Sequence, residues 1–167
     1  QRQMCIRDSP YLQGERSPYW DANLRASFTG VSISSTKGDF IRALLEGVAF
    51  SLKDCYGVIA EMGLPVGRIF LIGGGARSAL WSEIVADVFN VEVAVPSPGD
   101  ASFGAALLAG VGAGFFANAK SAVAKCLKID RTVKPDPARA AKYAALFEKY
   151  KAVHDALAPV YNSNFQK

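Results

Sequence analysis

The chain has 167 residues, of which half are hydrophobic and a fifth are charged, and it carries a formal net charge of +4. This length suffices for one domain with a sizeable core, and the composition is that of an ordinary globular protein. The lysine and arginine residues are scattered among acidic residues, which argues against the clustered basic surface typical of nucleic-acid-binding proteins.

Cysteine and histidine usage argues against a disulfide framework and against a zinc site. The three cysteines form no CxxC pair, and His154 is the only histidine, so we assign no metal ligand and expect a reducing compartment. The sequence shows neither a signal peptide nor a membrane-spanning segment, since its most apolar stretch, residues 103–116, is short and rich in Gly and Ala. We therefore expect a cytoplasmic protein that binds neither membrane nor nucleic acid.

The first nine residues show no periodicity and look foreign to the rest of the chain. Residues 4–9, MCIRDS, resemble translated sequencing adapter, so residues 1–9 are interpreted as a non-native leader and set apart from fold prediction. Residues 10–161 then form the native domain, truncated at its N-terminus, and residues 162–167 form a tail. Residues 10–35 predict an irregular, ordered loop region that ends in a short strand.

A long amphipathic helix is predicted over residues 37–62. Thr36 is its N-cap, Asp39 completes a capping box, and Gly63 ends it. Apolar residues recur at steps of three and four and predict a single inner face; they are Ile41, Leu45, Val48, Leu52, Tyr56 and Ile59.

The remaining elements alternate between strands and helices. Residues 68–72 predict a buried strand, three glycines follow, and Ser78 caps a helix to Phe89 whose inner face holds Leu80, Ile84, Val85 and Val88. Residues 91–95 predict a second strand closed by Pro96, and residues 98–100 a turn. Helices are predicted over residues 101–112, 118–127 and 138–158. This order indicates an α/β fold, and one domain is its simplest account.

The glycine run at residues 73–75 is the most informative local feature, because it joins a strand to a helix. Glycines let a ligand approach the main chain, and the helix after them offers free amides and a positive dipole end to an anion such as a nucleotide phosphate. A tight turn without a ligand is the alternative. Neither of two common phosphate motifs fits: GxxxxGK[ST] is absent, and GxGxxG fails because Ser78 occupies the third glycine position.

Four blocks in fixed order resemble the FGGY family of carbohydrate kinases, and its xylulokinase members most of all. They are LQGERSP at residues 12–18, LEGVAF at 45–50, IGGGARSALW at 72–81 and FGAALLAGVGAG at 103–114. The similarity extends over residues 10–161. The combination is specific, although no single block is.

The resemblance implies the C-terminal lobe of a two-lobed kinase of the actin-like ATPase, ribonuclease-H-like type. In such enzymes ATP lies against the C-terminal lobe, the sugar lies chiefly on the N-terminal lobe, and the γ-phosphoryl group passes to a sugar hydroxyl with Mg²⁺. The family's catalytic aspartate lies upstream of every block present, so no catalytic residue is assigned. We expect ATP, ADP and a sugar as partners, and the full-length protein is compatible with a homodimer.

The substrate implied by the resemblance is D-xylulose, which would become D-xylulose 5-phosphate. Sister kinases acting on ribulose, gluconate, glycerol or a deoxy sugar are the nearest alternatives, and a non-catalytic actin-like nucleotide-binding module is an alternative of another class. We expect the chain alone to lack kinase turnover. We also expect it to self-associate through apolar surface that another lobe would cover, with Tyr19 and Trp20 as the predicted surface.

The same resemblance assigns the nucleotide site. It places Gly73, Gly74, Gly75 and Ala76 along the adenosine and α-phosphate, followed by Ser78 and Ala79 where several relatives have an asparagine that faces adenine. Which of the last two lies nearest the base stays open.

The other blocks have two interpretations each. Glu46 is either a solvated or internally paired carboxylate or a support for the glycine turn. Glu15 and Arg16 either pair with loop backbone or an absent lobe, or position substrate or metal. The small-residue helix either serves close packing, which we expect, or lets its backbone approach a flat adenine; the loop at residues 99–102 is expected near the nucleotide.

Overall fold

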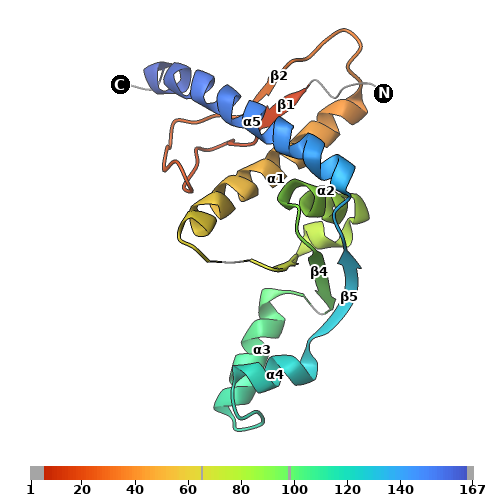
Figure 1. The fold of residues 1–167 in the computed structure, drawn as a ribbon. Helices are drawn as coiled ribbons and strands as arrows, with labels where there is room; N and C mark the ends of the chain where they lie inside the picture. Colours follow the sequence, from red (N-terminus) through yellow and green to blue (C-terminus); the bar gives the residue numbers. More distant parts are fainter. Residues whose placement is uncertain (1–5, 65, 98, 165–167) are drawn as a thin grey trace. The chain divides into compact units, whose positions relative to one another are not determined.

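The computed structural model describes residues 6–64, 66–97 and 99–164 (Figure 1). The chain divides into two compact units, one formed by Gln1–Val66 together with Pro137–Lys167 and the other by Gly67–Asp136. Each unit has its own sheet: β1 and β2 pair in the first, and β3, β4 and β5 pair in the second.

The first unit is organised by α1 (Lys37–Glu61), whose start and end follow the prediction. The hydroxyl of Thr36 accepts the Asp39 N–H, and the Asp39 carboxylate accepts the Thr36 N–H at 2.8 Å. Two of the amide groups that the helix start leaves without partners are thereby satisfied. Gly63, with φ +73°, follows the last turn in the left-handed region that glycine tolerates.

The buried face of α1 differs from the predicted stripe. The inner residues are mostly small ones, and they contact β1 and α5; they are Ala43, Glu46, Gly47, Ala49 and Phe50. A Cβ atom at Gly47 would lie 2.8 Å from the Asp8 carbonyl oxygen, so the absence of a side chain permits this approach. The predicted inner residues Ile41, Val48 and Leu52 are instead exposed, at 50%, 40% and 45%.

Aromatic side chains join α1 to α5 (Pro137–Asn164), which crosses it in Figure 1. The ring of Phe50 lies 5.5–6.0 Å from the rings of Tyr143, Phe147 and Tyr150. Spacings of this kind add favourable ring–ring geometry to the burial of apolar surface. Burial raises the pKa of Tyr143 to about 12, so its hydroxyl stays a neutral hydrogen-bond donor.

The small sheet of the first unit pairs β1 (Arg7–Ser9) with β2 (Ser27–Thr29) in antiparallel register. The strand β2 confirms the prediction of a short strand at the end of the loop region. The strand β1 lies in the segment interpreted as a leader, and its neighbour Ile6 is buried at 4% exposure. Residues 6–9 therefore take part in packing, and their origin stays a prediction.

The sheet of the second unit has the order β3-β4-β5. The strand β3 (Ile69–Phe70) is parallel to β4 (Val93–Ser97), and β4 is antiparallel to β5 (Lys128–Val133). The expectation of a buried first strand was wrong, because β3 pairs only with β4 among the described residues and Phe70 is half-exposed. Pro96 lies inside β4, at its register irregularity, where a missing N–H is tolerated.

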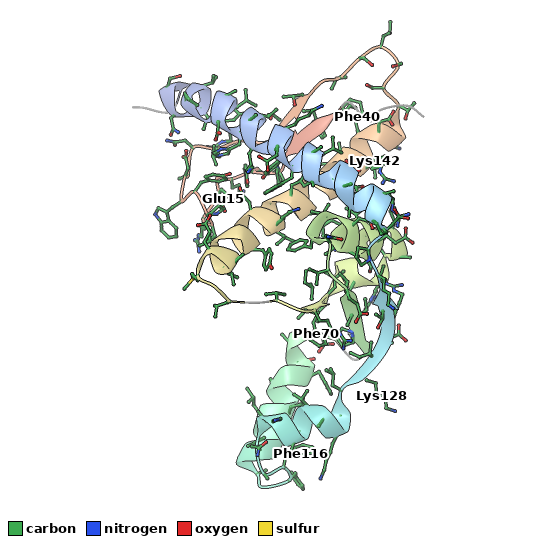
Figure 2. All side chains as sticks on the ribbon, viewed as in Figure 1. Glu15, Phe40, Phe70, Phe116, Lys128 and Lys142 are labelled. Atoms are coloured by element: carbon green, nitrogen blue, oxygen red, sulfur yellow. The ribbon has the colours of Figure 1, made fainter. Side chains whose placement is uncertain are left out.

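The strand β5 was missed because its sequence, KIDRTV, is polar and its residues are mostly exposed or half-exposed. Figure 2 labels Lys128 at its start and Phe70 on β3. The helix α2 (Ala79–Phe89) buries Ile84, Val85 and Val88 as predicted, but Trp81 takes the inner position assigned to Leu80, which is exposed.

The helices α3 (Ala101–Gly112) and α4 (Ala119–Cys126) form a hairpin at the predicted positions. The ring of Phe116, labelled in Figure 2, packs against Gly110. A Cβ atom at Gly110 would lie 2.8 Å from that ring. This contact supports the packing interpretation of the small-residue helix. Among the helices that the structure describes, none is long and apolar enough to cross a bilayer.

One buried carboxyl group makes stability depend on pH. Both side-chain oxygens of Asp8 are buried without a hydrogen-bond partner among the described residues, and desolvation raises the pKa of Asp8 from 3.8 to about 6. The folded state therefore favours the protonated form of Asp8. The contribution of this group to the free energy of unfolding is fully present below pH 4 and is lost as pH rises through 6.

We expect wild-type chain to lose about 1–3 kcal/mol of unfolding free energy between pH 4 and pH 7 relative to Asp8→Asn, which cannot ionise. Urea unfolding at several pH values measures the difference. Asp130→Asn, at an exposed site on β5, is the matched control and should follow the wild-type curve. If the unfolding free energies of wild type and Asp8→Asn changed in parallel with pH, the burial of a destabilising Asp8 carboxylate would be contradicted.

Candidate functional site

The glycine turn lies directly after β3 and opens with a backbone conformation that requires glycine. Gly73 has φ +82° and ψ −167°, a region essentially closed to residues with a Cβ atom. A single 3₁₀ turn, η1 (Gly74–Arg77), follows and leads into α2. This turn carries the chain from the end of β3 at Phe70 to the start of α2 at Ala79.

The structure explains each of the three glycines differently. Gly73 supplies the positive φ, whereas Gly75 makes room for Trp81, since a Cβ atom at Gly75 would lie 3.1 Å from the indole Nε1. Within the run, only Gly73 has a positive φ. A Cβ atom at Gly74 would meet nothing within 4 Å, so nothing in the described chain requires glycine there.

The start of α2 offers amide groups to an anion. Ser78 caps the helix as predicted: its hydroxyl accepts the Trp81 N–H at 3.2 Å, and its carbonyl accepts the Ser82 N–H at 3.1 Å. The amides of Ala79 and Leu80 precede the first intrahelical hydrogen bond, so helix geometry leaves them without an acceptor in the helix. Both residues are exposed.

A second loop lies against the glycine turn. The Gly73 N–H donates to the Gly99 carbonyl at 3.0 Å. Gly99 itself needs to be small, because a Cβ atom there would lie 2.8 Å from the Pro96 carbonyl oxygen. Because β3 and β4 are parallel neighbours, the turn and this loop both follow carboxyl ends of strands, which is where open α/β sheets bind ligands.

Electrostatics distinguish the two helix starts at this edge. The carboxylate of Asp100 caps α3, and hydrogen bonds from the Ser102 hydroxyl and the Phe103 N–H lower the pKa of Asp100. A fixed negative charge thus already occupies the start of α3. The start of α2 has a neutral cap and no acidic residue in its first turn, so its positive dipole end is open to an anion.

The predicted site residues thus fall into two groups. The surface group is Gly73, Gly74, Gly75, Ser78 and Ala79, all of which are exposed. Ala76 is buried at 5% exposure, so its methyl group packs inside the unit and only its backbone borders the turn. Sequence-based prediction missed Trp81 and Arg131. The Trp81 ring lies next to Gly75, and Arg131 donates to the Ala76 carbonyl, so only tertiary contacts reveal these side chains.

The other candidate residues have structural roles. Glu46 is buried and is paired with Arg42 at 2.9 Å and with the Tyr143 hydroxyl at 2.8 Å, which confirms the internally paired interpretation. Glu15, labelled in Figure 2, accepts backbone N–H groups of its own loop, from Ser17 and from Tyr19 at 2.9 Å. Pairing with loop backbone is thereby confirmed for Glu15.

The loop aromatics behave differently from each other. Trp20 is exposed at 78%, as expected. Tyr19 is half-buried: its ring stacks on His154 of α5 with centroids 3.7 Å apart, and its hydroxyl donates to Asp54. The expectation of an exposed Tyr19 was therefore wrong, because His154 and Asp54 hold it against the helices.

The described residues provide no group of three or more His, Cys, Asp or Glu side chains that could hold a metal ion. An Mg²⁺ ion of this chemistry is typically bound through substrate phosphates and one or two carboxylates.

Comparison with known proteins identifies the lineage of this arrangement. The model of the FGGY family of carbohydrate kinases, C-terminal domain, matches residues 4–113, which include the glycine turn and α3. The chain belongs to the FGGY family of carbohydrate kinases. Xylulose kinase of Staphylococcus epidermidis is 39% identical over 150 residues, covering 89% of this chain and 29% of that protein.

Solved structures of FGGY kinases share the fold. The ligand-bound xylulose kinase from Lactobacillus acidophilus matches with a TM-score of 0.86 at 30% identity, and the gluconate kinase from the same organism with 0.85 at 30%. In both cases 95% of this chain and 32% of the other chain are covered. The fold is thus that of an actin-like α/β kinase lobe, and the chain spans about a third of the length of these relatives.

The glycine turn predicts a ranking of stabilities. Gly73→Ala should cost about 1–3 kcal/mol because of its backbone conformation, and Gly75→Ala about 1 kcal/mol because the Trp81 ring must shift. Gly74→Ala should stay within about 0.5 kcal/mol of wild type. Urea unfolding tests the order, with Gly67→Ala as control because its Cβ atom would also meet nothing within 4 Å. A large loss at Gly74 would contradict the assignment.

Proposed function

We propose that this chain is the C-terminal, ATP-binding lobe of a cytoplasmic kinase that transfers the γ-phosphoryl group of ATP to a sugar hydroxyl. The observation that carries the proposal is the glycine turn at the start of α2, within the segment matched by the FGGY kinase model. Family membership supports ATP as the nucleotide, and the exposed amides at the turn suit an anion.

The adenosine and α-phosphate would lie along Gly74 and Gly75, with Ala79 at the free end of α2. The open space next to Gly74 supports this placement, because a Cβ atom there would meet no other atom within 4 Å. A side chain there would occupy the volume that the nucleotide needs. Ser78 is engaged as the helix cap, so the exposed Ala79 is the better candidate for contact with the base.

Transfer of a phosphoryl group requires more than this site supplies. The acceptor hydroxyl must be held in line, the phosphate charge must be neutralised, and the nucleophile must be oriented. Here the chain offers backbone donors for the nucleotide, and we assign the sugar site and the catalytic base to parts of the kinase outside it. The exposed apolar residues of α1, among them Ile41, Leu44, Val48 and Leu52, are consistent with a larger protein.

The proposed substrate is D-xylulose, which would be converted to D-xylulose 5-phosphate. The S. epidermidis xylulose kinase supports this choice by its coverage of most of the chain. Gluconate is the second candidate, since a gluconate kinase structure matches this chain about as well as a xylulose kinase structure does. Substrate choice therefore does not follow from the shape of this lobe.

Gly74→Val should weaken nucleotide binding without unfolding the protein. We expect about a tenfold rise or more in the Kd for ATP in the complete kinase, with sugar binding nearly unchanged, because loss of close approach disturbs several hydrogen bonds. Calorimetric titration with ATP and, separately, with sugar measures both.

The same substitution at Gly67 serves as the control, because that glycine is equally open and lies before β3. Gly67→Val should leave both affinities at the wild-type value. Equal loss of ATP and sugar binding in Gly74→Val would indicate misfolding and would count against the nucleotide placement.

The substrate is tested by coupled ADP release from the complete kinase with D-xylulose, gluconate, ribulose, glycerol and erythritol as acceptors. We expect kcat/KM to be highest for D-xylulose, and the isolated 167-residue chain to show no sugar-dependent turnover. A higher kcat/KM for gluconate would identify gluconate, and not D-xylulose, as the preferred substrate. Turnover by the chain alone would place the catalytic base among residues that are interpreted here as structural.

A further inference from the structure

The side chain of Arg131 is hydrogen-bonded to the segment that follows the glycine run. Arg131 belongs to β5 and is half-buried, and its Nη2 donates to the Ala76 carbonyl at 2.8 Å and to the Ser82 hydroxyl at 2.9 Å. One guanidinium group thus contacts η1 and α2 at once. Hydrogen bonds from a charged donor are stronger than neutral ones, and a rigid, planar donor group fixes their directions.

Ser82 extends this contact to the helix cap. Its side chain is fully buried, and its hydroxyl donates to the Ser78 carbonyl at 3.0 Å, while its N–H donates to the same oxygen at 3.1 Å. Arg131, Ser82 and the two carbonyls therefore form one connected network on the inner side of the turn.

This network determines which way the neighbouring amides point. In a trans peptide the C=O and N–H groups of one peptide unit point in opposite directions. Holding the Ser78 carbonyl inward therefore directs the Ala79 N–H away from the network, toward the open end of α2.

We propose that Arg131 is a positioning residue for the nucleotide: it holds the backbone of residues 76–79 so that the amides after the glycine run are oriented toward the phosphate. The inference rests on the proposed nucleotide site. Arg131 itself bonds to the inner carbonyl and hydroxyl oxygens, so it acts through the backbone and not as a catalytic residue. Its charge also adds positive potential behind an anion site.

Hydrogen exchange tests the positioning role without any ligand. In the complete kinase, Arg131→Met should speed amide exchange in peptides covering residues 73–82 by about tenfold or more, because a charge-assisted contact is lost. Peptides from α1 and α5 should keep wild-type protection. Arg131→Lys retains charge but has a compact donor group, so it should give an intermediate rate.

Nucleotide titration tests the consequence. We expect the Kd for ATP to rise about tenfold in Arg131→Met, and to be partly restored in Arg131→Lys, while the KM for sugar stays at the wild-type value. Arg68→Met is the matched control, because Arg68 forms a partly exposed ion pair with Glu92 before β3 and β4, at 2.7 Å. It should change neither exchange nor ATP affinity.

The outcomes separate this inference from the proposed function. Unchanged exchange at residues 73–82 in Arg131→Met overturns the inference, and so does faster exchange with an unchanged Kd for ATP. A uniform loss of ATP and sugar binding with a lower unfolding midpoint also overturns it, because it indicates a general structural role. Absence of ATP binding by the wild-type kinase overturns the proposed site and with it the nucleotide role of Arg131.

Discussion

The second unit depends on one backbone constraint, the positive φ of Gly73 together with its hydrogen bond to Gly99. The conformation turns the chain from β3 into η1, and the bond ties that turn to the loop after β4. Two loops that are 26 positions apart are thereby held at one sheet edge. A residue with a Cβ atom would strain the first of these features and weaken the second, because both reside in the same peptide region.

The first unit follows a different constraint, close packing through small residues. Gly47 lets α1 approach β1, and the Phe50 ring packs against aromatic rings of α5. Several bulky aliphatic residues of α1, among them Ile41, Val48 and Leu52, are exposed. A helix can therefore be strongly apolar and still bury its small residues, and the exposed remainder is the kind of surface that a larger assembly covers.

The proposed nucleotide site would form one wall of an active site. Backbone amides at a glycine turn can hold a nucleotide, since they present donors without the volume of side chains. The turn lies within the segment that matches the C-terminal domain of the FGGY family of carbohydrate kinases. The two helix starts at the sheet edge are not equivalent, because Asp100 neutralises one of them and Ser78 leaves the other open. That asymmetry favours α2 over α3 as the helix that would bind an anion in the proposed site.

Local features of this protein could be determined from its sequence. The capping box of Thr36 and Asp39, the helix start at Ser78 and the bounds of α3 depend on neighbouring residues, and so did the place of the glycine turn. The tertiary structure alone decided the inner face of α1, the existence of β5 and the contacts of Arg131. An apolar stripe does not say what it packs against, a polar strand is formed by its pairing partner, and the Arg131 contact joins residues 55 positions apart. Such contacts leave no periodic signal in the chain, because periodicity reports the geometry of one element and not its neighbours.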